Sequence, residues 1–173
     1  MSDKAGLKRE FIIDAVALIH FLAGDRALLP LISRYLGRIW IATTTLEEVE
    51  QVEEEDCVEL GMYLVEPSIQ QLNEASIYAE GTPLSIPDAV SLILAQDNDL
   101  TLITNDVALR RESQKRGIRL LWGLETIALM VERKILPYEE AAEIAQRIHL
   151  ANPKYITEKI LQDFHNKINK FKV

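Results

Sequence analysis

Acidic residues at the ends of predicted strands point most directly to chemistry in this sequence. Asp14 closes the apolar segment FIID (11–14), and Asp106 follows the apolar segment LTLIT (100–104) in a similar way. Each could simply cap the helix that follows, because aspartate is a favoured N-cap residue. However, the carboxyl ends of parallel strands meet at one edge of a sheet, where ligands bind. We therefore expect the two aspartates to face one pocket.

Asp88 belongs to the segment SIPDAVSLILAQ (85–96), which is nearly all apolar and predicts a buried helix. The spacing puts Ser85 at the N-cap and Asp88 at the third helical position, a variant of the capping box. The same helix leads directly into the strand that ends at Thr104. Capping alone and a place in the same site are equally compatible with this motif.

A glutamate from the acidic segment TLEEVEQVEEEDCVEL (45–60) is the fourth candidate. The segment predicts one helix, with an apolar stripe formed by Leu46, Val49 and Val52. Glu48 borders this stripe near the end of the preceding strand (38–42), whereas Glu47 points away from it towards solvent. Glu50 also flanks the stripe and remains the competing candidate.

Four carboxylates in one cleft raise one another's pKa values unless a positive charge is present. Residues 39–109 contain fifteen acidic residues and no Lys or Arg, in a chain whose net charge is −8. Oxygen ligands without Cys or His suit Mg²⁺ or Mn²⁺. A metal held in this way can activate a water and polarise a phosphodiester oxygen. The acidic middle of the chain would repel a phosphate-bearing partner unless such cations intervene.

Basic residues follow directly after Asp106 and are candidates to hold a phosphate backbone near the cleft. They are Arg110, Arg111, Lys115, Arg116 and Arg119. A solvated helix face is the alternative interpretation of this run, and the sequence favours neither.

The remaining metal-binding residue types fit structural roles better than chemical ones. Cys57 is the only cysteine, so an intrachain disulfide is impossible and a cytoplasmic location is expected. We interpret it as a small apolar residue. His20, His149 and His165 have unrelated spacings and are expected to be surface or packing residues. The sequence contains no apolar run long enough to span a bilayer, and no membrane association is expected.

Short apolar runs alternate with helical patterns, which predicts an α/β fold with a mostly parallel sheet. The expected fold is a three-layer α/β/α sandwich with additional C-terminal helices. We expect one domain at residues 1–125 and a helical extension at 126–173, packed on or next to it. The strands are predicted at 11–14, 38–42, 62–67, 100–104 and 118–122, and the helices after residue 60 at 68–80, 85–96, 123–133, 138–148 and 157–170.

Four stretches together resemble the PIN domain, a family of small metal-dependent nucleases, in the order and spacing of that family. The resemblance spans residues 10 to about 121, and the tail RGIRLLWGLETIALMVERKIL followed by YITEKILQDF is similar to one PIN subgroup. The four stretches are FIIDAVALI, IATTTLEEVE, PLSIPDAVSLILA and LTLITNDVALRR.

This resemblance implies that an acidic site of Asp14, Glu48, Asp88 and Asp106 holds Mg²⁺ or Mn²⁺. Thr104 takes the position of a Ser or Thr whose hydroxyl orients a carboxylate, and Asn105 lies between Thr104 and the last acid. The family often has Ser or Asn two residues after the first aspartate, whereas this chain has Val16. That difference removes a polar group that supports the metal ligands.

The activity implied by the resemblance is hydrolysis of phosphodiester bonds by metal-activated water, with RNA as the expected substrate. The family includes toxins of toxin–antitoxin pairs, RNA-processing nucleases and many homodimers, so an antitoxin partner and a homodimer are expectations. The alternative is a degenerate PIN scaffold that binds RNA or a protein without cleavage. An aspartyl phosphatase would need a second aspartate at the position of Val16, and a receiver domain would need a paired acid near the first strand.

Overall fold

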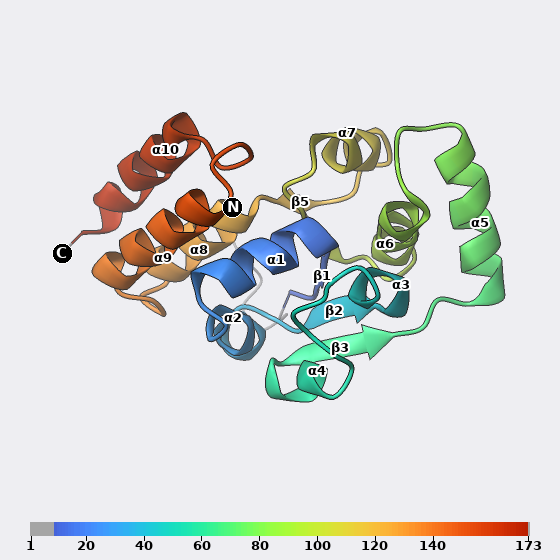
Figure 1. Ribbon diagram of the computed structural model, residues 1–173, viewed down its shortest axis with the longest axis horizontal. Helices are drawn as coiled ribbons and strands as arrows, with labels where there is room; N and C mark the ends of the chain where they lie inside the picture. Colours follow the sequence, from blue (N-terminus) through green and yellow to red (C-terminus); the bar gives the residue numbers. More distant parts are fainter. Residues whose placement is uncertain (1–8, 173) are drawn as a thin grey trace.

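A five-stranded parallel sheet forms the centre of the protein in the computed structural model, which describes residues 9–172 (Figure 1). The strand order is β3-β2-β1-β4-β5, and each of the four neighbouring pairs is parallel. This confirms the predicted fold class. The strands are β1 (Phe11–Ile13), β2 (Ile39–Ala42), β3 (Met62–Val65), β4 (Thr101–Ile103) and β5 (Leu120–Leu121).

Helices cover both faces of the sheet, and alternate side chains of β1 belong to the two resulting cores. Ile12 packs with the core on one side, whereas Phe11 and Ile13 pack with the core on the other, as expected for a strand buried on both faces. The core containing Ile12 includes residues of α5 (Ile69–Glu80), α6 (Ile86–Asp97) and α7 (Val107–Lys115). The other includes residues of α1 (Ala15–Gly24), α2 (Leu28–Tyr35), α8 (Gly123–Glu132), α9 (Tyr138–Ala151) and α10 (Glu158–Ile168).

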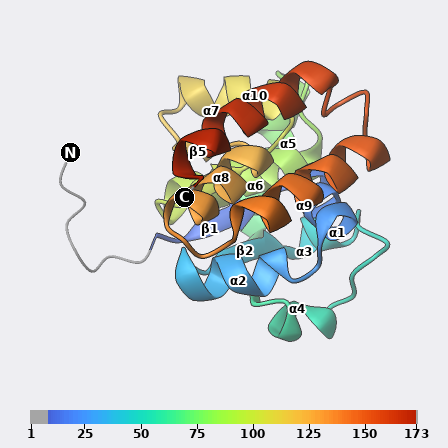
Figure 2. The ribbon, with the colours of Figure 1, turned by 90° about the vertical axis from the view of Figure 1, so that its left-hand side faces the viewer.

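The C-terminal helices pack directly on the first helix of the sheet domain (Figure 2). A Cβ atom at Gly24 would lie 2.8 Å from Ile148 Cγ1, so glycine permits the close approach of α1 and α9. Arg147 Nε also donates a hydrogen bond of 2.7 Å to the Gly24 carbonyl oxygen. The expected boundary after residue 125 falls inside α8, which shares its core with α1.

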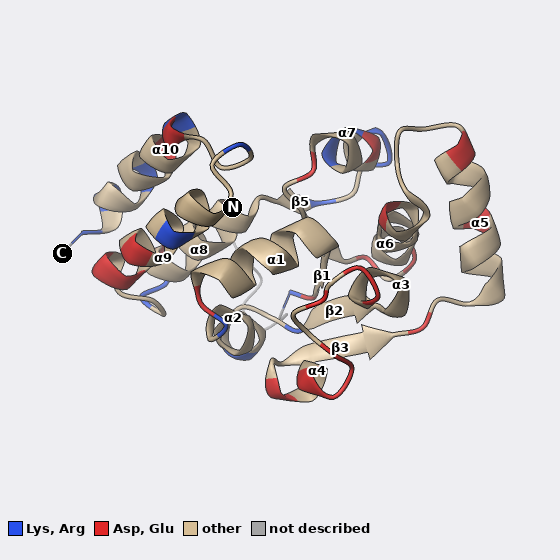
Figure 3. Ribbon diagram, viewed as in Figure 1, with Lys and Arg blue, Asp and Glu red and all other residues tan. Residues whose placement is uncertain are grey.

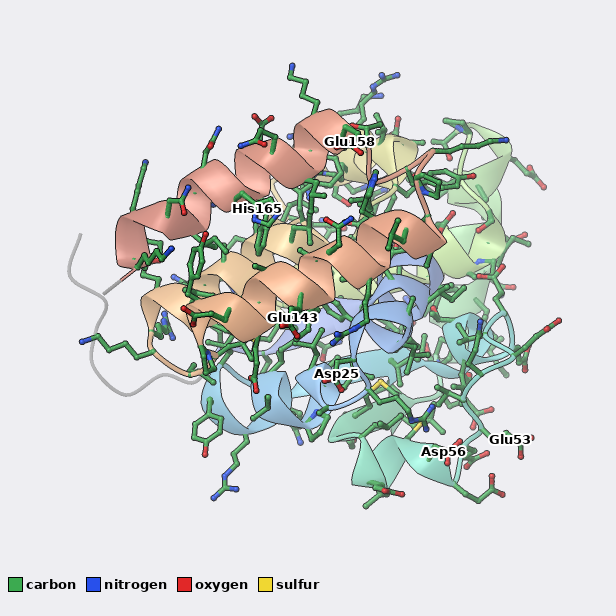
Figure 4. All side chains as sticks on the ribbon, turned by 60° about the vertical axis from the view of Figure 1, so that its left-hand side comes forward. Asp25, Glu53, Asp56, Glu143, Glu158 and His165 are labelled. Carbon is green, nitrogen blue, oxygen red and sulfur yellow. The ribbon has the colours of Figure 1, made fainter. Side chains whose placement is uncertain are left out.

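Charged side chains lie at the ends of these helices, where Figure 4 labels Asp25 after α1 and Glu158 at the start of α10. Arg147 Nη2 lies 4.0 Å from a carboxylate oxygen of Asp25, which follows α1. His149 Nε2 lies 3.3 Å from Glu158 Oε1 at the start of α10, and His149 Nδ1 is 2.6 Å from the Ile156 carbonyl oxygen. His149 therefore has a structural role, in agreement with the expectation from sequence. A short 3₁₀ helix, Asn169–Phe171, follows α10.

The prediction of one acidic helix over 45–60 is wrong. The chain instead forms two single turns, α3 (Thr43–Leu46) and α4 (Asp56–Glu59), joined by a loop. Seven of the ten residues at 47–56 are acidic, and like charges at helical spacing destabilise a helix. The Asp56 carboxylate accepts a hydrogen bond of 2.9 Å from the Glu53 N–H, which stabilises the turn before α4.

No single helix within residues 9–172 is both long and apolar enough to cross a membrane, although α1 and α2 taken together, with a bend of 112° between them, have sufficient length and apolar character.

Candidate active site

The carboxyl ends of β1 and β4 form the point at which the direction of strand addition reverses. From β1 the chain adds β2 and β3 on one side, and it then returns to add β4 and β5 on the other. Such a switch point leaves a crevice outside the strand ends, where open α/β sheets bind ligands. Asp14 follows β1 and Asp106 follows β4, and the Asp14 N–H donates to the Ile103 carbonyl oxygen at 3.2 Å. The two aspartates therefore lie at the same edge, as expected.

The hydroxyl of Thr104 connects these two aspartates. Thr104 is completely buried, and its Oγ1 donates a hydrogen bond to Asp14 Oδ2. The same oxygen accepts a hydrogen bond of 3.0 Å from the Asp106 N–H. Thr104 thus orients the Asp14 carboxylate, which is only 2% exposed, relative to the start of α7.

Asp14 and Asp106 also have the capping roles that the sequence allows. By contrast, α6 is capped by Ser85, and the Asp88 carboxylate bonds to that hydroxyl in place of the capping-box backbone N–H. Asp14 Oδ1 accepts from the Ala17 N–H at 2.8 Å, and Asp106 Oδ1 accepts from the Leu109 N–H at 2.7 Å. Asp88 Oδ2 accepts from the Ser85 hydroxyl at 2.8 Å, and the Ser85 hydroxyl accepts from the Asp88 N–H at 3.2 Å. Capping and a place at the shared edge are compatible, because a carboxylate has two oxygens.

The carboxylates act on one another electrostatically. Burial raises the pKa of Asp14 to about 7; hydrogen bonds from Thr104 and Ala17 oppose this shift, and the charges of Asp88 and Asp106 add to it. Burial also raises the pKa of Asp88; the Ser85 hydroxyl opposes this shift, and the charge of Asp106 adds to it. Burial is the main cause of these pKa shifts, and the neighbouring carboxylates add to it.

Glu48 approaches this cluster from a turn, not from the predicted long helix. It follows α3, and its N–H donates to the Thr45 carbonyl oxygen at 3.1 Å. Glu47 and Glu48 are both exposed, so the argument from helix phase does not separate them. The pKa of Glu48 is nevertheless raised by partial burial and by the charge of Asp88.

A buried pair of hydroxyls holds the Glu48 turn beside the helix that carries Asp88. Thr45 Oγ1 and Ser91 Oγ lie 3.2 Å apart, and both residues are almost fully enclosed. Glu50, the competing candidate, is exposed, whereas Val49 and Val52 are buried as the apolar stripe predicts. Glu48 is therefore the glutamate that the fold associates with the aspartates.

The four acidic residues fit a hard divalent cation in donor type and in charge. Within residues 9–172, however, no three Asp, Glu, His or Cys side chains already form a closed ligand group. One oxygen each of Asp14, Asp88 and Asp106 accepts a hydrogen bond at the start of its own helix, and the second Asp14 oxygen accepts one from Thr104. A cation would bind the remaining lone pairs, and its charge would offset the repulsion between the carboxylates.

Two of the predicted basic residues lie near this edge. Arg110 is on the first turns of α7, where its Nη1 donates to the Thr104 carbonyl oxygen at 3.3 Å. Its guanidinium carbon lies 3.6 Å from the centre of the Trp122 ring, a close cation–π contact. Arg111 follows it and is exposed.

The other basic residues lie at the opposite edge of the sheet, so the expectation that the whole run borders the cleft is wrong. Arg116 Nη1 donates to Gln96 Oε1 at 2.7 Å, and Arg119 Nη2 donates to the Asp99 carbonyl oxygen at 2.8 Å. Gln96 and Asp99 precede β4, and Lys115 ends α7. The helix begins at the acidic edge and carries these side chains away from it (Figure 3).

Sequence reasoning missed a polar network beside the acids. Asn105 does not face a carboxylate: its Oδ1 accepts from the Gly123 N–H at 2.9 Å, and its Nδ2 lies 2.7 Å from His20 Nδ1. His20 is 2% exposed. It lines a pocket beside Asp106, and Val16 lines that pocket too. The sequence feature that indicates this network is the lone histidine in the apolar helix AVALIHFLAG.

Comparison with models of known protein families gives no match for this chain. Comparison with curated proteins gives no match either. The function of the protein is therefore inferred from the geometry and electrostatics of the site.

Proposed function

We propose that this protein is a PIN-like endoribonuclease that depends on Mg²⁺ or Mn²⁺. The observation behind the proposal is the convergence of acidic residues at one switch point, where the Thr104 hydroxyl links Asp14 after β1 to Asp106 after β4. Asp88 on α6 lies near enough for its charge to act on Asp14 and on Glu48. Uncompensated carboxylates at a ligand-binding edge are the donor set that hard divalent cations require. Asp14, Asp88 and Asp106 would hold the cation, with Glu48 completing the group.

When bound, such a cation supplies an activated water and a positive charge for the phosphodiester oxygens. The protein's own residues position these reactants. Thr104 keeps the Asp14 carboxylate directed to the edge, and the helix caps fix the aspartate backbones. Arg110, held between the Thr104 carbonyl and the Trp122 ring, provides positive charge beside the acids for a substrate phosphate.

Cleavage of a mixed RNA pool with Mn²⁺, compared with the same reaction in EDTA, tests this proposal. Asp106→Asn should abolish cleavage, and Glu143→Gln, an exposed change on α9 that removes the same charge away from the pockets, should leave it intact. The alternative of a degenerate scaffold predicts RNA binding without metal-dependent cleavage. Val16 favours that alternative, since an apolar side chain takes the place where the family often has a polar group.

The proposed cellular context follows from the PIN resemblance. A cytoplasmic location, a homodimer and silencing by an antitoxin protein are parts of that proposal. The resemblance is compatible with a toxin and with an RNA-processing enzyme. Light scattering at high concentration tests the dimer: a species of twice the chain mass is expected, and a monomer alone would reject it.

A further inference from the structure

A pocket of about 450 Å³ lies beside Asp106, between α1, the start of α7 and the α9–α10 connection. Its walls are mainly apolar, with Val16, Ile19 and Val107 among them. A second hollow of about 380 Å³ shares Asn105 and Tyr155 with it and extends to Trp122. The two hollows therefore meet at Asn105 and Tyr155, next to the proposed cation-binding edge.

His20 provides a hydrogen-bond donor to the first pocket. The Gly123 N–H requires an acceptor, which fixes the Asn105 oxygen on that side and turns its NH₂ group to His20 Nδ1. His20 Nδ1 then accepts, so the ring proton lies on Nε2. Within residues 9–172 no group bonds to Nε2, and this atom is not among the fully enclosed polar atoms without partners. It therefore reaches the pocket that His20 lines.

Tyr155 places an aromatic face at the mouth of the same pocket. It lies in the α9–α10 connection, is 69% exposed, and its ring centre is 6.5 Å from that of His20. Exposed aromatic side chains are the platforms on which proteins stack the bases of single-stranded nucleic acids. Trp122, which contacts Arg110, provides a second aromatic side chain at the adjoining hollow.

We propose that this pocket binds one nucleobase of the RNA substrate next to the phosphate that is cleaved. His20 Nε2–H donates to an acceptor atom on the edge of the base, and the Tyr155 ring stacks on its face. The apolar walls enclose the rest of the base. The inference deepens the proposed nuclease function and rests on it for the identity of the ligand as RNA.

Neutral nucleosides test the base pocket independently of the cation site, because they carry no phosphate. Adenosine, guanosine, cytidine and uridine should each be titrated into ¹⁵N-labelled protein without metal, with the histidine ring resonances as the readout. At least one nucleoside should shift the His20 Nε2–H resonance in a saturable manner. His165 on α10 serves as an internal control and should not move.

Tyr155→Ala should weaken this nucleoside binding about tenfold, the order expected for loss of one base–aromatic stack. Tyr155→Phe should retain it. The matched control is Tyr35→Ala, which removes another exposed tyrosine, outside the pocket, and should have no effect. His20→Phe, which keeps a ring but removes the donor, should also weaken nucleoside binding. If this buried substitution impairs folding, the comparison of Tyr155→Ala with Tyr155→Phe still tests the pocket, because Tyr155 is exposed.

Hydrolysis of bis(p-nitrophenyl) phosphate with Mn²⁺ tests the nuclease chemistry on a substrate without a nucleobase. Tyr35→Ala should leave this reaction and RNA cleavage unchanged, whereas Tyr155→Ala should reduce RNA cleavage. Nucleosides that leave His20 unaffected, or equal losses from Tyr155→Ala and Tyr35→Ala, would overturn the base pocket. Absence of hydrolysis of both diester and RNA by the wild type would overturn the nuclease function instead, whatever the nucleoside titration gives.

Discussion

The Thr104 hydroxyl donates a hydrogen bond to the Asp14 carboxylate across the junction of β4 and β1, while it accepts one from the Asp106 backbone. One buried oxygen thereby links the two strand-terminal acids of the sheet. Burial raises the pKa of the almost fully enclosed Asp14, and this bond orients the carboxylate and opposes that rise.

Thr104→Val should weaken Mn²⁺ binding by about 10- to 100-fold, the range found when a group that orients a metal ligand is removed. The loss of this bond should also raise the pKa of Asp14 further, since the bond lowers it now. Calorimetry over a pH series should show the onset of Mn²⁺ binding moving to higher pH. Thr104→Ser keeps the hydroxyl and should behave as wild type; equal losses from Val and Ser would show that Thr104 acts through packing alone.

The stability of the metal-free protein should fall as the pH rises from about 4 to about 7. The pKa of Asp14 is raised to about 7, against about 4 in an unfolded chain, so the native state binds more protons in this window. The total effect is on the order of 4 kcal/mol in the free energy of unfolding. Urea unfolding at several pH values measures it.

Asp14→Asn should remove most of this pH dependence, and Mn²⁺ should oppose it in the wild type by binding only the folded state. Asp163→Asn is the control of equal charge change, because Asp163 is exposed on α10. A stability that does not fall over this range would contradict the burial of an ionisable Asp14.

Glu48→Gln should lower Mn²⁺-dependent RNA cleavage by orders of magnitude with little change in stability. Glu47→Gln should have almost no effect, as expected for an exposed surface change. The adjacent pair is a matched control, since both side chains are exposed and carry the same charge. Partial burial and the charge of Asp88 raise the pKa of Glu48. Similar losses from both variants would mean that general acidity, not a specific carboxylate, supports cleavage.

Arg110→Gln should weaken RNA binding and reduce the salt dependence of its affinity by about one phosphate contact. Arg116→Gln should change neither, because Arg116 lies at the opposite edge of the sheet and bonds to Gln96. Fluorescence anisotropy at several salt concentrations, without divalent metal, separates the two. The reverse order of effects would place the RNA on the other edge.

Strand positions and the shared edge could be predicted because buried parallel strands leave strong apolar runs in the sequence. Asp14 and Asp106 followed from the same reasoning, since each caps a helix that starts at that edge. Asp88 followed from its place in the first turn of α6, next to the Ser85 cap. The fold class needed no more than the alternation of strands and helices. The described sheet confirms it.

The acidic segment 45–60 could not be predicted correctly from periodicity. Its apolar residues recur at a helical spacing, but the repulsion among its carboxylates and the capping by Asp56 produce a loop between two short turns. The position of Glu48 depends on the Thr45–Ser91 contact, which joins residues distant in sequence. The His20–Asn105 bond is of the same kind, so only the folded structure reveals it.

Anomalous diffraction from crystals containing Mn²⁺ tests whether the acidic residues at the ends of β1 and β4 bind a cation, because it locates the cation without reference to activity. We predict a peak at the junction of β1 and β4, about 2.1 Å from carboxylate oxygens of Asp14 and Asp106, the distance typical of small hard cations. The peak should disappear in Asp14→Asn. No peak at that edge at saturating Mn²⁺, or a peak that persists in Asp14→Asn, would contradict the proposed cation site.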